Sequence, residues 1–228
     1  MQINEQTVPI EEGWSGEFQG PSELYRIKGG TQLPSVSLGK PNWWADATIL
    51  GDKWHPPSGG QRYGVVRFAF SLRPESPQII KSATFTAHLL TTGSGSNPTA
   101  YDLYPRELKE TRKGDAKIAL GPNFTFGEAK ASVGSAQMTF DTSRAVPVIT
   151  ADGLGEQTIR WQFQSQRSHP LAGSRIVYAV VELPPQTPSL RVVLSLDARI
   201  QTGGLEGLIS GFLTREEQDK RSWVLGQS

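Results

Sequence analysis

The chain has 228 residues, and its 23 lysines and arginines nearly balance 22 aspartates and glutamates. A chain of this length buries roughly 70% of its unfolded surface, which is enough for one core. The absence of cysteine excludes disulfides, cysteine-ligated metals and thiol nucleophiles. No apolar run approaches the ~20 residues of a membrane-crossing helix, and the first residues do not match a secretory signal. We therefore expect a cytoplasmic protein without membrane insertion.

Residues 1–60 are predicted to form an irregular, loop-rich lead-in with short strands that packs onto the rest of the chain. Glycine and proline supply 15 of these 60 residues, and four of the six tryptophans lie here: Trp14, Trp43, Trp44 and Trp54. Neighbouring residues of an extended segment point to opposite faces. We therefore expect one of Trp43 and Trp44 to lie in the core and the other to be exposed.

Between residues 64 and 202 the hydrophobic pattern has a period of two, which is typical of half-buried strands. Residues 175–183 are apolar at nearly every position and predict a central strand covered on both faces. Segments rich in proline and glycine separate these runs and predict turns. The fold predicted is all-β, an antiparallel β-sandwich of about nine or more strands. The expected strands are the alternating stretches 66–73, 83–90, 158–164 and 192–201, the central stretch 175–183, and the shorter stretches 117–120, 123–126, 136–140 and 146–150.

The C-terminal part of the sequence changes its pattern. Leu205, Leu208, Ile209 and Phe212 recur at helical spacing, and residues 214–217 match a capping box. These signals predict a short helix over about residues 215–225. The chain is accordingly divided into an irregular lead-in (1–60), a sandwich core (64–202) and a helical tail (205–228), all within a single domain.

No motif in the sequence indicates catalysis. The patterns of a nucleophile elbow, a zinc protease helix, a phosphate-binding loop and a dinucleotide fingerprint are all missing. We therefore predict no catalytic residues, no metal and no cofactor, and regard a non-enzyme as the better interpretation. A hydrolase whose site is assembled from dispersed residues, with one of three histidines as base, is the second alternative.

Tryptophans suggest a ligand site, because an exposed indole beside polar groups can stack on a sugar or another ring. Carbohydrate or small-ligand binding is therefore the first alternative function. The candidate ligand-binding residues are Trp43, Trp44, Trp54, Asp46, Asp52 and Arg62.

The function we favour from the sequence is a non-catalytic β-sandwich module that mediates protein–protein association or self-association in the cytoplasm. The candidate partner-binding residues are Leu205, Leu208, Phe212 and Trp223, all in the tail. Nucleic acid is argued against as a partner, because the basic residues around 106–117 alternate with acidic ones and carry little excess charge.

Overall fold

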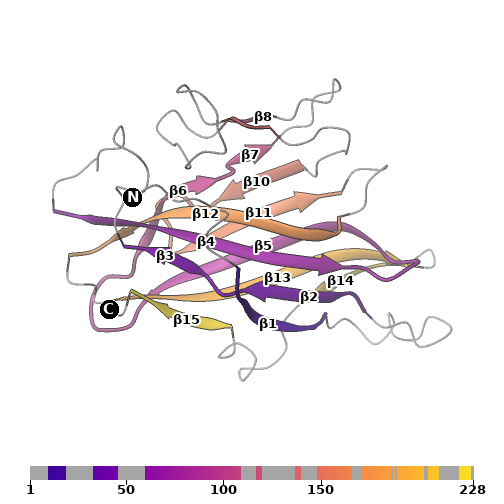
Figure 1. The fold of residues 1–228 in the computed structure, drawn as a ribbon, viewed down its shortest axis with the longest axis horizontal. Coiled ribbons are helices and arrows are strands. Elements are labelled where there is room, and N and C mark those ends of the chain that lie inside the picture. Colours follow the sequence, from indigo (N-terminus) through magenta and orange to yellow (C-terminus); the bar gives the residue numbers. More distant parts are fainter. Residues whose placement is uncertain are drawn as a thin grey trace.

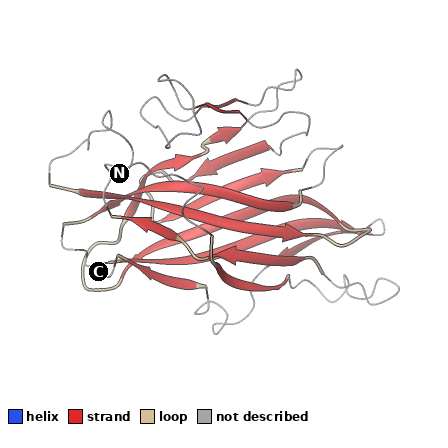
Figure 2. Ribbon diagram, in the orientation of Figure 1, coloured by secondary structure: helices blue, strands red, loops and turns tan. Residues whose placement is uncertain are grey.

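The computed structural model describes residues 10–18, 33–45, 60–108, 117–119, 137–139, 148–165, 171–185, 187, 189–202, 205–210 and 221–226. Within these residues the chain forms strands and loops and no helix (Figure 2). Every strand pair is antiparallel. The predicted all-β antiparallel sandwich is thereby confirmed.

Two large sheets form the body of the molecule (Figure 1). The first has six strands in the order β1-β2-β4-β12-β6, with β3 also paired to β4. Its strands are β1 (Glu12–Glu17), β2 (Ser35–Gly39), β3 (Asn42–Trp44), β4 (Arg62–Arg73), β6 (Thr99–Tyr104) and β12 (Gly173–Leu183).

The second sheet has seven strands in the order β14-β13-β5-β11-β10-β7, with β15 also paired to β13. Its strands are β5 (Ile79–Thr91), β7 (Glu107–Leu108), β10 (Val148–Asp152), β11 (Thr158–Gln164), β13 (Leu190–Thr202), β14 (Leu205–Ser210) and β15 (Ser222–Leu225). A separate two-stranded sheet consists of β8 (Lys117–Ala119) and β9 (Gln137–Thr139).

Aromatic rings join the two large sheets in the core. Phe70 of β4 stacks on Phe85 of β5 with ring centroids 5.1 Å apart, and Phe68 lies 5.9 Å from Trp161 of β11. All four side chains are at most 2% exposed. The alternation that predicted β4, β5, β11 and β13 therefore selects the residues that fill the space between the sheets.

The lead-in contributes three short strands among its described residues, as expected. β1, β2 and β3 extend the six-stranded sheet, and Val36 and Leu38 of β2 are buried in the core. In β12, residues 177–181 are all buried, as expected for a strand covered on both faces. The predicted strand at 123–126 lies outside the described residues.

The predicted C-terminal helix is wrong where the structure describes it. Residues 205–210 form β14 on the edge of β13, and residues 222–225 form β15 on the same strand. A ladder partner in β13 outweighs a weak helical pattern that contains two glycines, because each glycine costs a helix about 1 kcal/mol. Residues 211–220 lie outside the described part.

Candidate functional site: a tryptophan cluster and the segment between β7 and β10

The structure places the predicted site residues in several different regions. Trp43 and Trp44 lie in β3, Arg62 begins β4, and Trp223 lies in β15. Arg62 donates a hydrogen bond to the carbonyl of Thr187. Leu205 and Leu208 lie in β14, whereas Asp46, Asp52, Trp54 and Phe212 fall outside the described residues.

Trp43 and Trp44 occupy opposite faces of β3, as the sequence predicted, yet both are half-buried. Trp43 stands opposite Val66, and its ring covers Gly64, where a Cβ would lie 2.1 Å from Cη2 of the indole. Trp44 lies beside the guanidinium of Arg67, whose Cζ is 5.7 Å from the ring centroid. The expected division into one core and one exposed tryptophan is therefore wrong, because Trp43 packs against Gly64 and Trp44 packs beside Arg67.

Asn42 fixes the arginine beneath Trp44. Arg67 is 2% exposed, and its Nε and Nη2 donate to Asn42 Oδ1 at 3.0 and 2.6 Å. The amide oxygen accepts hydrogen bonds from the buried guanidinium, and the face of the indole attracts its positive charge. Both contacts offset the cost of removing the cation from water. β3 is thus attached to β4 by its side chains as well as by its ladder.

The C-terminal strand lies close to β3, so the predicted ligand-binding residue Trp43 and the predicted partner-binding residue Trp223 belong to one region, although they are about 180 residues apart in sequence. A Cβ on Gly226, just after β15, would lie 3.1 Å from Nε1 of Trp43. A Cβ on Gly13 of β1 would lie 2.7 Å from Cζ2 of Trp223. β15 therefore pairs with β13 in one sheet and packs against β1 and β3 of the other.

Sequence reasoning missed Trp14 and Arg221, which complete this cluster. Arg221 is 1% exposed, and its Cζ lies 4.1 Å from the ring centroid of Trp14. The Trp14 ring also covers Gly16, two residues further along β1. A tryptophan two residues from a glycine in a strand was the available signal, since the two share a face.

We call Trp14, Trp43, Trp44, Trp223, Arg67 and Arg221 the tryptophan cluster. Three of its indole rings lie against glycines, so protein backbone covers part of each aromatic surface. The arrangement joins the edge strands of the two sheets. A ligand-binding role for Trp43 and Trp44 stays a prediction.

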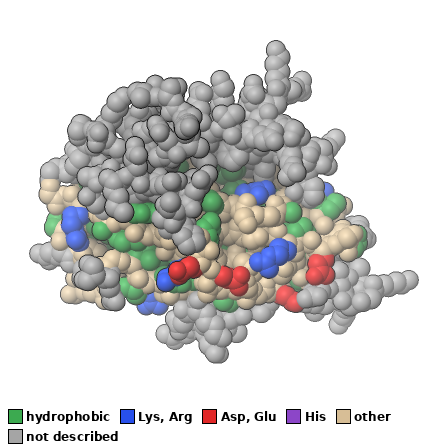
Figure 3. All heavy atoms as spheres, in the orientation of Figure 1, with side chains coloured by type: hydrophobic (Ala, Val, Ile, Leu, Met, Phe, Trp, Pro, Cys, Tyr) green, Lys and Arg blue, Asp and Glu red, His purple; other side chains and the backbone are tan. Residues whose placement is uncertain are grey.

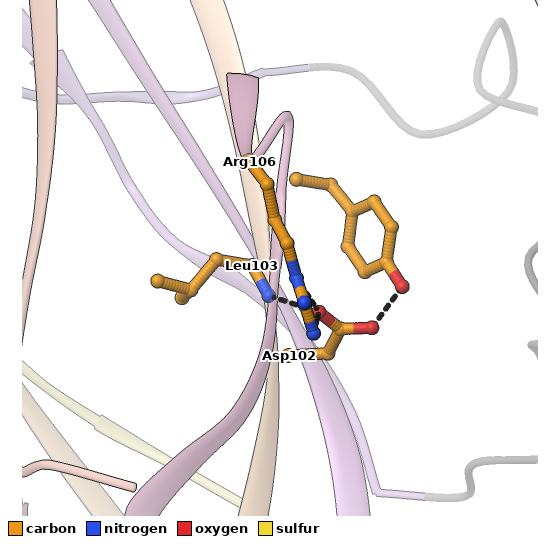
Figure 4. A network of polar contacts seen from close by, with 4 residues as sticks. Asp102, Leu103 and Arg106 are labelled. Atoms are coloured by element: carbon orange, nitrogen blue, oxygen red, sulfur yellow. Dashed lines mark hydrogen bonds and ion pairs between the residues drawn. The ribbon is translucent and has the colours of Figure 1, made fainter. Parts of the chain in front are cut away.

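A second polar arrangement fixes the turn between β6 and β7 (Figure 4). Asp102 accepts hydrogen bonds from the backbone N–H of Leu103 at 2.9 Å, from the Tyr104 hydroxyl, and from Arg106 Nε at 2.7 Å. Burial, followed by the hydrogen bond to Asp102, raises the pKa of Tyr104 well above its usual range. The phenol therefore stays protonated and continues to donate, and Arg106 in turn accepts a backbone hydrogen bond from Ala151 of β10.

Of the three histidines, His88 is the one that lies in the described residues. Its Nδ1 lies 3.0 Å from Thr158 Oγ1. Burial and then the positive charge of Arg160 lower its pKa. The described residues also contain no group of three or more His, Cys, Asp or Glu that could hold a metal ion.

The long connection between β7 and β10 is the other notable feature. β7 and β10 are paired neighbours, with Leu108 opposite Ile149 and Glu107 opposite Thr150. Between them the chain runs through residues 109–147 and forms the separate β8–β9 pair, which lies at the top of Figure 1. Connections between adjacent strands are usually 2–5 residues long, and much longer ones are commonly functional.

Charges of both signs are spread over the described part of the face drawn in Figure 3. In the view of Figure 3, acidic and basic side chains alternate along the described part without a patch of one sign. Among the described residues, no helix is long and apolar enough to cross a membrane.

Comparison with known proteins gives structural likeness only. No family model matches the sequence, and no curated protein matches it. Among solved structures, Clostridium perfringens delta-toxin is similar at 11% identity and a TM-score of 0.40, covering 78% of this chain and 79% of the toxin. A structure described as a pore forming protein is similar at 7% identity and a TM-score of 0.38, covering 86% of this chain and 92% of that one.

These names contradict three expectations from the sequence. The cytoplasmic protein-association module is wrong as the leading function, because the similar structures are a toxin and a pore forming protein. The expectations of no membrane insertion and of a cytoplasmic location are wrong on the same finding. The sequence argument failed because a search for a continuous apolar run tests helical spans alone.

Proposed function

We propose that this chain acts on lipid membranes and that the β8–β9 pair, with the chain that joins it, is the part that enters the bilayer. The observation that carries the proposal is the alternating polarity of this pair. Its register places Ile118 opposite Met138, between the pairs Lys117–Thr139 and Ala119–Gln137. An apolar pair is thus flanked by two pairs that contain a polar residue.

The sequence that follows β8 continues the alternation. Residues 118, 120, 122, 124 and 126 are Ile, Leu, Pro, Phe and Phe, whereas 119, 121, 123 and 125 are Ala, Gly, Asn and Thr. A membrane-crossing strand needs about 9–11 residues with one apolar face and one polar or small face. The stretch 117–126 has this length and this pattern.

Charges are placed where such a segment tolerates them. Between residues 118 and 139 the only charged residues are Glu128 and Lys130, midway between the two strands. A charge in the centre of the hydrocarbon layer costs about 2–4 kcal/mol on a lipid-facing strand position, and far less at the interface. The distribution favours passage of both arms with the charges on the far side.

The position of the segment in the fold also supports the proposal. β8 and β9 belong to neither large sheet, so their movement breaks no ladder of the sandwich. The two ends are held at the β7–β10 pair and by the hydrogen bond from Ala151 to Arg106. The sandwich can therefore remain folded while the segment changes its surroundings.

Release of a trapped dye from phosphatidylcholine–cholesterol vesicles tests this proposal. We expect Met138→Asp to slow dye release several-fold, because it puts a charge on the apolar face of the pair, near the interfacial end of the segment. The neighbouring Gln137→Asp is the matched control and is expected to stay within about twofold of the unchanged chain, since it faces water. Both variants should keep the urea midpoint of the sandwich.

The result that contradicts the proposal is equally specific. Equal dye release by Met138→Asp, Gln137→Asp and the unchanged chain would remove the role of the β8–β9 pair. Failure of the unchanged chain to release dye from these vesicles would remove the membrane role itself.

A further inference from the structure

Among the described residues, six strands of the two large sheets pair on one side only, and these edge strands differ in how well they are protected against further pairing. The edges are β1, β3 and β6 in the six-stranded sheet, and β7, β14 and β15 in the seven-stranded sheet. An edge strand presents a row of backbone N–H and C=O groups on which another strand can pair. Proteins blunt such edges with charges, prolines, bulges or very short strands.

Five of these edges carry one of these devices. The register of β1 shifts between Glu12 and Trp14. The pairing of β6 shifts at Val180 and Val181 of β12, and β6 is followed directly by Pro105. β7, β3 and β15 contain two, three and four residues, and strands this short are poor partners for another strand.

β14 carries none of them. Its six residues pair with β13 in an unbroken register from Thr202–Leu205 to Asp197–Ser210. The sequence LEGLIS contains no proline, no lysine and one charge, at Glu206. Over the part of the chain that the structure describes, no strand pairs with the other side of β14.

We propose that β14 is a self-association edge, on which β14 of a second copy of this chain pairs antiparallel about a two-fold axis. The inference is independent of the proposed membrane role, because it concerns the protein in water. A two-fold axis perpendicular to the sheet keeps each side chain on the same face of the sheet, and opposite residues of an antiparallel pair share a face. The axis therefore lies midway between the two copies of one residue, which stands opposite itself. The pairing would join the two seven-stranded sheets into one.

The sequence of β14 favours Leu208 as the central residue. Leu208 stands opposite the exposed Arg199 in the β13–β14 ladder. With the axis at Leu208, each copy sets Leu208 against Leu208, and Glu206 against Ser210. The apolar residues then meet, and the two carboxylates lie apart on opposite sides of the axis, which avoids a direct like-charge pair.

Single cysteines test this geometry cleanly, because the natural chain contains none. Leu208→Cys is expected to form a disulfide-linked dimer under mild oxidation, since opposite residues of an antiparallel pair lie within disulfide distance. Glu206→Cys and Ser210→Cys should each fail alone, because four residues of offset separate identical positions by roughly 13 Å. A mixture of those two variants should cross-link. Ile176→Cys, on exposed Ile176 of the internal strand β12, is the control.

Light scattering on the full chain gives a second, independent readout. We expect a mass twice the 24.9 kDa of one chain, reduced to one chain by Leu208→Lys, because lysine protects edges. The matched variant Ile176→Lys should leave the mass unchanged. A monomeric unchanged chain, a dimer that survives Leu208→Lys, or cross-linking of Leu208→Cys no greater than that of Ile176→Cys would overturn the proposal.

Discussion

Replacing Phe85 by alanine is expected to lower the free energy of unfolding by about 3–5 kcal/mol, the range typical of a large aromatic removed from a core. Phe85 is 0% exposed and touches rings from both sheets. Its centroid lies 5.1 Å from that of Phe70 and 6.0 Å from that of Trp161. The substitution therefore removes transfer free energy and leaves a cavity where the two sheets meet.

Urea unfolding followed by tryptophan fluorescence measures this effect. Ile79→Ala in the same strand is the control, because Ile79 is 39% exposed and its loss opens no cavity. We expect the control to change stability by less than about 1 kcal/mol. Equal destabilisation by the two variants would show that the ring contacts between the sheets do not form the centre of the core.

The second large effect is expected at Gly64, where we predict that alanine destabilises the chain by about 1–3 kcal/mol. The new methyl group would lie 2.1 Å from Cη2 and 2.4 Å from Cζ2 of Trp43. Such distances force the indole to move, and Gly226 lies beside the pyrrole end of the same ring. One methyl group therefore disturbs the contact between β3, β4 and the C-terminus.

A double-mutant cycle separates this clash from other effects of a strand glycine. Trp43→Ala removes the ring that the methyl group meets, so Gly64→Ala should cost far less in that background. We expect a coupling energy of at least about 1 kcal/mol between the two substitutions. Additive changes in the free energy of unfolding would show that the ring does not cover Gly64.

The sequence was informative where side chains alternate along one strand. In β11 and β13 every second residue is buried, and the period of two alone identified both strands and their core residues. β14 shows the opposite case. Leu205, Gly207 and Ile209 fit a strand, while Leu205, Leu208 and Ile209 fit a helix, and the β13 partner decides between them. The position of β13 beside this segment depends on the pairing of the whole sheet, so the six residues of β14 do not determine it on their own.

The tryptophan cluster was only partly predictable. Sequence reasoning selected Trp43, Trp44 and Trp223 as aromatic candidates, but placed them in two unrelated groups. Contacts between β15 and the lead-in connect residues about 200 positions apart, and no local pattern encodes them. Arg221 was missed because a buried arginine looks like any surface arginine until its aromatic neighbour is placed.

The two strands of the candidate membrane segment were predicted from the sequence, but a role for them in membrane binding was not. Residues 117–120 and 136–140 were predicted as strands of the sandwich, whereas β8 and β9 form a sheet of their own. Alternation shows that one face is apolar but does not say whether protein or lipid covers it. Our proposal that lipid covers it rests on the separation of β8 and β9 from both large sheets.

The most direct test of the membrane proposal is a fluorophore scan across the β8–β9 pair. Single cysteines at 118, 119, 137 and 138 are labelled with a polarity-sensitive dye, and emission is recorded with and without phosphatidylcholine–cholesterol vesicles. Leu154→Cys, at an exposed turn residue of the sandwich, is the control. We predict a blue shift at 118 and 138 and none at 119, 137 or 154. The same emission at all five positions, with or without vesicles, would contradict entry of this pair into the bilayer.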